Sequence, residues 1–204
     1  MVKKLTFYIT LAAGGLLIAA CRPLPPSDAD MGPQLERTPQ DDWWEAMAQH
    51  CGNAYAGQLA VAPEGDTMVL PGQRLVVHFR ECAEGEMRLP FHIQQGPDTW
   101  DRSRTWIYTR SVDGIALNHD HRRRDGHPDT TTGYGGTTEN GGSAEEQVFI
   151  YSEPTEEGLQ RGWRVQIEPN VRYTGTFRGD DWRWRVDFDL TETVDLPPAP
   201  WGYR

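Results

Sequence analysis

The sequence predicts a mainly β protein, an antiparallel β-barrel or sandwich of about eight to ten strands with a short N-terminal helix. From residue 55 on, apolar and polar residues alternate with a period of two in most segments, which is typical of strands with one buried and one solvated face. These segments are short, and residues that favour turns separate them. Eight tryptophans in 204 residues supply large side chains for a β core.

The helix is expected to begin at Asp41 and to end near Gly52. Asp41 and Asp42 suit a helix N-terminus, because carboxylates there accept hydrogen bonds from the free backbone N–H groups. Trp43 and Met47 follow at helical spacing and predict one apolar face.

Ten segments are expected to form strands, with turn signals between them. The clearest is the last one, in which Trp182, Trp184 and Val186 alternate with charged residues. Asp113 and Gly114 separate two segments and predict a hairpin turn, because this pair tolerates positive φ. The expected strands are residues 55–61, 74–82, 87–94, 104–110, 115–121, 130–138, 147–152, 163–167, 171–177 and 182–190.

Proline and apolar content divide the chain into four parts. Residues 1–20 read as a signal peptide, because two lysines precede an apolar run that is too short for a spanning helix. Residues 21–40 are rich in proline and predict an extended tether. Residues 41–196 hold one β-barrel domain, and residues 197–204 form a proline-rich tail that either crosses the barrel or hangs free.

The residues Ile18-Ala19-Ala20-Cys21, at the end of the apolar run, resemble the lipobox of bacterial lipoproteins. The resemblance implies cleavage before Cys21 and lipidation of its thiol and its new amino group. Arg22 stands where an aspartate often retains such proteins in the inner membrane. The same resemblance therefore implies the outer membrane, with the domain facing the periplasm. The alternatives are an ordinary secretory peptide that leaves Cys21 as a free thiol, and a membrane-anchored helix that is never cut.

Besides Cys21, the chain has two cysteines, Cys51 and Cys82. In an oxidising periplasm two remaining cysteines are expected to form a disulfide. The alternative is a cysteine-based metal or redox site, which the spacing does not favour because it lacks a Cys-x-x-Cys motif.

The charge of the mature chain argues against nucleic acid as a partner. Lys3 and Lys4 are the only lysines, so removing residues 1–20 leaves 18 arginines of the 20 basic residues against 30 acidic ones, and 18 − 30 gives −12. A body of this charge repels phosphate backbones and anionic headgroups at long range. Contact with the membrane is therefore expected through the N-terminal lipid.

Residues 118–129 hold the side chains that suggest metal binding. His119 and His121 share one face of the expected strand, with Cα atoms about 7 Å apart, so both imidazoles can reach one divalent transition metal. His127 or Asp129 would complete the site from the following loop. The alternative is a polar strand end whose side chains bond to neighbouring arginines and turn backbone.

Arg102, Arg104 and Trp106 are the candidate ligand-binding residues. Arginine beside tryptophan can stack on the indole ring and still bind an anion through two N–H groups. The alternative is a solvated sheet face on which arginines and aspartates pair across strands. Some of the tryptophans are further candidates to line a ligand cavity inside the barrel.

The opening helix, followed by a strand that contains glycine, resembles the start of lipocalin-like (calycin) barrels. The Gly-x-Trp signature of that family is missing, and Gly52-Asn53-Ala54-Tyr55 is the nearest segment. The resemblance implies architecture alone.

The expected function is non-enzymatic: a lipid-anchored cell-envelope protein that binds a small molecule or an envelope partner. One alternative is a metal-binding or metal-dependent hydrolytic site around His119 and His121. Another is a structural accessory of an outer-membrane assembly. The alternatives differ in whether the domain holds a metal, a cavity or neither.

Overall fold

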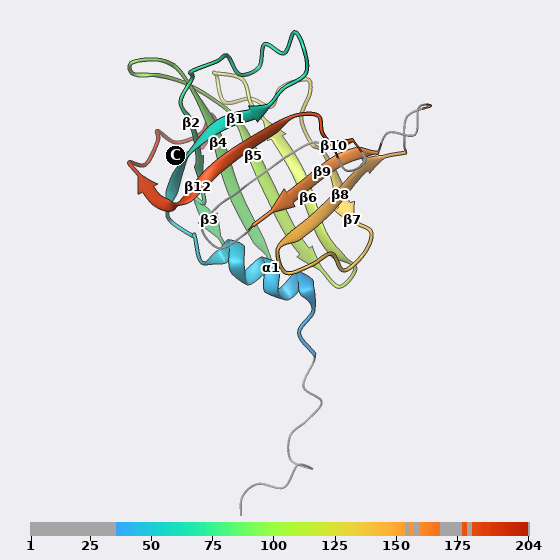
Figure 1. Cartoon of the computed structure of the whole chain (residues 1–204). Coiled ribbons are helices and arrows are strands. Elements are labelled where there is room, and N and C mark those ends of the chain that lie inside the picture. The colour runs from blue at the N-terminus through green and yellow to red at the C-terminus, as the bar shows by residue number, and fades with distance from the viewer. Residues whose placement is uncertain (1–35, 154–155, 157–159, 168–176, 179–180, 204) are drawn as a thin grey trace, which may run out of the picture. The chain divides into compact units, whose positions relative to one another are not determined.

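The computed structural model of the protein describes residues 36–153, 156, 160–167, 177–178 and 181–203 (Figure 1). Arg37–Arg204 forms one compact unit, so the domain includes both the helix and the C-terminal tail. The signal segment, Cys21 and nearly all of the tether lie outside the described residues, as does most of the strand expected at 171–177. Within the described part of the chain, no helix is both long and apolar enough to cross a membrane.

The described elements are one helix and twelve strands. They are α1 (Pro39–Ala48), β1 (Ala54–Val61), β2 (Leu75–His78), β3 (Glu81–Cys82), β4 (Glu86–Gly96), β5 (Thr99–Ser111), β6 (Gly114–His121), β7 (Tyr134–Thr138), β8 (Glu146–Ser152), β9 (Arg161–Gln166), β10 (Phe177–Arg178), β11 (Asp181–Trp182) and β12 (Arg185–Val194).

Ten of these strands form a single curled sheet, a half-barrel (Figure 1). Its order is β12-β1-β2-β4-β5-β6-β7-β8-β9, with β3 paired to β4, and β10 and β11 form a separate hairpin. Nearly every strand pairs with its neighbour in sequence, and β12 returns to pair with β1. The mainly β, antiparallel prediction is confirmed. Of its two architectures the sheet matches the barrel, because its strands belong to one curled layer rather than two stacked ones.

Helix α1 covers one end of the half-barrel (Figure 1). It begins at Pro39, two residues before the expected start, because Thr38 is the N-cap and Asp41 is the third residue of a capping box. The Thr38 hydroxyl accepts from the Asp41 backbone N–H, while the Asp41 carboxylate accepts from that of Thr38. Trp43 is fully buried and meets the ring of Tyr108, with centroids 5.6 Å apart. The end of the barrel next to α1 is thus filled by aromatic packing.

The hairpin expected at Asp113-Gly114 is confirmed, with a shift of one residue. Strands β5 and β6 pair with Ser111 opposite Gly114, so the two turn residues are Val112 and Asp113. Gly114 has a φ of +130°, which residues with a Cβ rarely adopt.

Glycine also permits the short strand β7. A Cβ at Gly135 would lie 2.0 Å from the backbone oxygen of Leu117 on β6. The glycine-rich segment is thus a strand that packs unusually close to its neighbour.

The C-terminal tail crosses the sheet rather than hanging free. The Trp201 backbone N–H donates to the carbonyl of Arg102 at 3.0 Å, and the Arg102 Nη1 donates to the carbonyl of Ala199 at 2.9 Å. Further along, the Tyr203 hydroxyl donates to the Asp120 carboxylate at 2.7 Å. Asp120 neighbours the interior residue His119 on β6, so the alternation of a strand puts the tail on the outer face.

Cys51 and Cys82 lie at disulfide distance, with Cα atoms 6.2 Å apart, which supports the expected pairing. The bridge joins the chain just after α1 to β3 and closes a loop of 31 residues. Such a loop lowers the conformational entropy of the unfolded chain.

We predict that the Cys51→Ser/Cys82→Ser variant loses about 3–4 kcal/mol of unfolding free energy, because its unfolded chain is no longer restricted by this loop. Urea unfolding of the soluble domain, residues 37–204, measures the loss. Each single Cys→Ser variant serves as a control and should lose as much as the double variant. Equal stability of the double variant and the wild type would contradict the bridge.

Candidate functional site

A cavity of about 220 Å³ lies in the half of the barrel away from α1. Its floor follows from the register of four adjacent strands. Trp106 on β5 is the Cα partner of Leu89 on β4 and of His119 on β6, and His119 is the partner of Tyr134 on β7. Partners across a sheet point to the same face, so these four side chains form one row inside the barrel. All of the row except Leu89 line the cavity.

The next row adds an aromatic ring and a charge. Phe91 on β4 pairs with Arg104 on β5, and both side chains line the cavity. The rings of Phe91 and Trp106 stack with centroids 5.2 Å apart and planes only 6° from parallel. The floor is therefore mostly aromatic, with a guanidinium at its edge.

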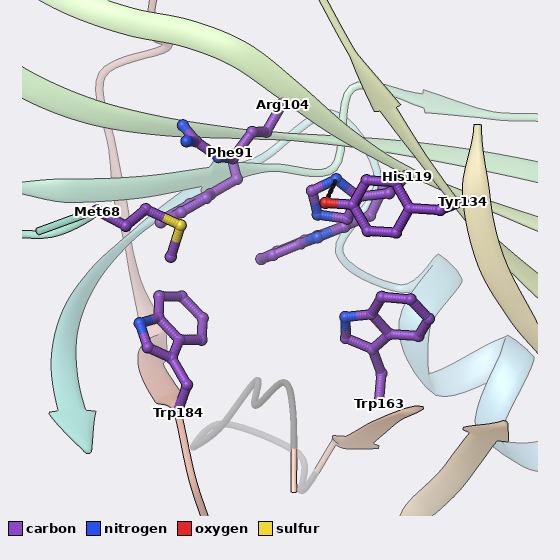
Figure 2. Close-up of a pocket in the computed structure, with 8 residues that line it drawn as sticks. Met68, Phe91, Arg104, His119, Tyr134, Trp163 and Trp184 are labelled. Carbon is purple, nitrogen blue, oxygen red and sulfur yellow. Dashed lines mark hydrogen bonds between the residues drawn. The ribbon is translucent and has the colours of Figure 1, made fainter. Parts of the chain in front are cut away.

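The opposite wall consists of Trp163 and Trp184, and Met68 lies beside Phe91 at one side of the gap (Figure 2). Figure 2 shows the two indoles standing across the gap from Phe91 and His119. The indole N–H of Trp184 donates to the Asp66 carboxylate at 3.1 Å, so the loop between β1 and β2 holds this ring in place. The same loop supplies Met68. The wall thus comes from parts of the chain that are far apart in sequence.

His119 is held neutral inside this cavity. It is 7% exposed, and its Nδ1 lies 3.0 Å from the Tyr134 hydroxyl (dashed line in Figure 2). Burial lowers the pKa of His119 to about 3, and the positive charge of Arg104 acts in the same direction. The neutral ring stacks on Tyr134 with centroids 4.8 Å apart. This pair presents neutral polar atoms, rather than a second charge, to a ligand.

Arg104 provides the charge of the cavity. Its Nη1 donates to the Asp101 carboxylate at 2.6 Å and to the Ser103 hydroxyl at 3.1 Å. Nε and Nη2 have no partner among the described residues, so two N–H-bearing nitrogens on one edge of the guanidinium are left to a ligand. The two hydrogen bonds from Nη1 fix the orientation of that edge.

The three predicted ligand-binding residues separate onto the two faces of the sheet. Arg104 and Trp106 line the cavity. Arg102 lies on the outer face, where its guanidinium is bonded to Ala199 in the tail. A bulge between Phe91 and Ile93, which pair with Arg104 and Asp101, changes the alternation at this point of β5.

The predicted metal ligands are only partly brought together. The rings of His119 and His121 have centroids 6.3 Å apart, and the His121 Nδ1 lies 3.6 Å from the Asp129 carboxylate. His127 is exposed and belongs to the turn that follows β6. In the described part of the chain, no group of three or more His, Cys, Asp or Glu side chains has an arrangement that would hold a metal ion.

The residues alone identify only part of the cavity wall. The sequence makes tryptophans in general candidates for a cavity without distinguishing Trp163 and Trp184 from core residues, and it places Tyr134 in the expected strand 130–138 without marking it as a site residue. Residues 122–133 join β6 to β7 by more than a tight turn, so no local signal sets the pairing of Tyr134 with His119.

Comparison with known proteins adds no further constraint: no family model, no curated protein and no solved structure matches the chain. The chemistry of the cavity is therefore the basis for inferring function. Aromatic walls with one cation and a few neutral polar atoms can bind and orient a small molecule.

We predict that His119 makes the stability of the fold depend on pH. The unfolded chain takes up a proton at this residue near pH 6.5, and the folded chain does so only near pH 3, so lowering the pH across this window favours unfolding. Between pH 7 and pH 5 this difference corresponds to about 2 kcal/mol.

The measurement is urea unfolding of the wild type and of His119→Phe at both pH values. The variant should lose less stability than the wild type on acidification. His92, whose pKa burial also lowers to about 3, is present in both proteins and contributes equally. Identical losses in the two proteins would show that His119 is not held neutral by the fold.

Proposed function

We propose that the protein is a lipid-anchored cell-envelope protein whose β domain binds a small molecule. The observation that carries this proposal is the aromatic cavity in the half-barrel, with Arg104 at its edge. Two neighbouring features of the sequence support the location: the lipobox that ends at Cys21, and the proline-rich tether that follows it.

The cavity favours binding of a small molecule over binding of a protein partner. Ligand sites are concave and mostly apolar, with a few polar groups that set orientation. Trp163 and Trp184 stand opposite the aromatic floor and Met68 lies at one side, which makes the space concave and not a flat patch. Its volume of about 220 Å³ is below the range typical of drug-sized ligands, so the ligand is small.

The lining favours binding over catalysis. Among the described residues that line the cavity there is no carboxylate, thiol or aliphatic hydroxyl to act as a nucleophile, and His119 is the one side chain of the type that most often acts as general base. The Nδ1 of His119 already has a partner in Tyr134. These side chains hold and orient a molecule rather than transfer a proton or a group.

We predict that the wild-type protein incorporates labelled palmitate and that Cys21→Ser does not, because the thiol of this residue is the expected site of acylation. Several acyl chains make anchoring effectively permanent, because each buried methylene contributes about 0.8 kcal/mol. The measurement is palmitate labelling of cells that carry the full-length chain, with Arg22→Gln as a control that keeps the cysteine. Equal labelling of Cys21→Ser, or no labelling of the wild type, would contradict lipid anchoring.

We predict that the wild-type domain binds indole, a small neutral aromatic probe, and that Trp163→Ala weakens binding about tenfold. Stacking of one aromatic ring on another contributes about 0.5–1.5 kcal/mol beyond the buried area, so losing one wall costs about this factor. Isothermal titration calorimetry gives the dissociation constants.

Trp100→Ala is the matched control, because Trp100 lies against His92 and Arg74 and does not line this cavity. This variant should bind as the wild type does. Native mass spectrometry of the detergent-extracted full-length protein adds a second measurement, in which a copurifying small molecule is expected. An empty protein that also fails to bind indole would contradict the proposed function.

A further inference from the structure

We infer that the cavity selects a flat aromatic molecule that carries a negatively charged group, with the ring against the indoles of Trp163 and Trp184 and the anion on Arg104. This inference rests on the proposed function and gives the chemical class of its ligand. It depends on three features of the cavity: the guanidinium of Arg104, the arrangement of the aromatic rings, and the neutral, hydrogen-bonded polar groups.

The positively charged group of the cavity is the Arg104 guanidinium, which is held in place through its Nη1 nitrogen. Asp101 and Ser103 both bind Nη1 of Arg104, at 2.6 and 3.1 Å. The edge formed by Nε and Nη2 has no partner among the described residues. A carboxylate or a similar oxyanion accepts two parallel hydrogen bonds from such an edge. The Arg104 side chain is only 16% exposed, so little water competes for these donors.

The shape of the cavity favours a planar ligand. The Phe91 and Trp106 rings are stacked within 6° of parallel, so each covers one face of the other. Trp184 meets Phe91 at 75°, with centroids 6.5 Å apart, and Trp163 lies within 17° of parallel to His119, with centroids 6.4 Å apart. The gap lies between the two indoles (Figure 2), and an aromatic ligand can stack on them there.

The polar groups favour an anion over a cation. Aromatic walls alone would also attract a quaternary ammonium group through cation–π contacts. Here Arg104 lines the same space, and although Asp101 balances its charge, its Nε–Nη2 edge offers hydrogen-bond donors that suit an anion and not a cation. His119 and Tyr134 are bonded to each other and add no negative charge. No carboxylate lines the cavity in the described part of the chain, so a ligand cation would have no counter-ion there.

The test compares three probes that share one ring system and differ in charge: 2-naphthoate, neutral 2-naphthamide and 2-naphthyltrimethylammonium. Isothermal titration calorimetry on the wild-type domain should give a dissociation constant for 2-naphthoate at least tenfold below those of the other two. This comparison needs no variant, so it stands even where a substitution disturbs folding.

Variants then assign the selectivity to Arg104. Arg104→Gln should raise the dissociation constant of 2-naphthoate about 10- to 100-fold and leave that of 2-naphthamide within about threefold, because only the charged probe loses its partner. Arg104→Lys keeps the charge and should give an intermediate value for the anion. Arg102→Gln is the matched control from the outer face of the same strand, and it should change neither value.

The failure of this inference differs from the failure of the proposed function. Equal or tighter binding of the amide or the ammonium probe would overturn the preference for an anion and leave small-molecule binding in place. Unchanged selectivity in Arg104→Gln would overturn the role of Arg104. If none of the three probes and no indole binds, both the inference and the proposed function are wrong.

Discussion

The register of strands β4 to β7 is the constraint on which the rest of the structure depends. It places Leu89, Trp106, His119 and Tyr134 in one row across four strands, so residues spread over 46 positions share one interior surface. A shift of one residue in the pairing of any two of these strands would turn a member of this row to the outer face. Two devices keep the register: the tight hairpin before Gly114, and the close approach of Gly135 to β6. The cavity is therefore a consequence of hairpin geometry and glycine placement.

The two ends of the half-barrel differ because the helix fills only one of them. Trp43 from α1 packs between the rings of Tyr108 and Phe149, and this end is closed by buried apolar area. No helix among the described residues enters the other end, where the rings of Trp163 and Trp184 leave a gap above the floor. One strand, β5, contributes both to the closed end through Tyr108 and to the cavity through Arg104. Inward-facing side chains of this one strand thus belong to the packed core at one end and to the cavity lining at the other.

Period-two alternation in the sequence predicted the mainly β class and most of the strands, because alternation is a local property of the chain, and the Asp113-Gly114 pair predicted the hairpin. Arginines beside a tryptophan brought Arg102, Arg104 and Trp106 forward together. Their separation onto two faces was not foreseen, because a bulge in the β4–β5 pairing changes which residues point inward, and bulges leave little trace in composition. Proximity in sequence grouped His127 with His119, although the turn after β6 carries His127 to the surface. The opposite wall could not be predicted, since the contact that holds Trp184 joins it to Asp66, 118 residues away.

The most direct test of this account is a two-dimensional ¹⁵N–¹H NMR spectrum of the tryptophan indole N–H groups, recorded during a titration with 2-naphthoate. The indole signals of Trp106, Trp163 and Trp184 should move together and saturate at one dissociation constant. The signals of Trp43, at the closed end, and of Trp100, on the outer face, should stay in place. Movement of the Trp100 signal alone, or of none of these signals, would contradict a binding site inside the half-barrel.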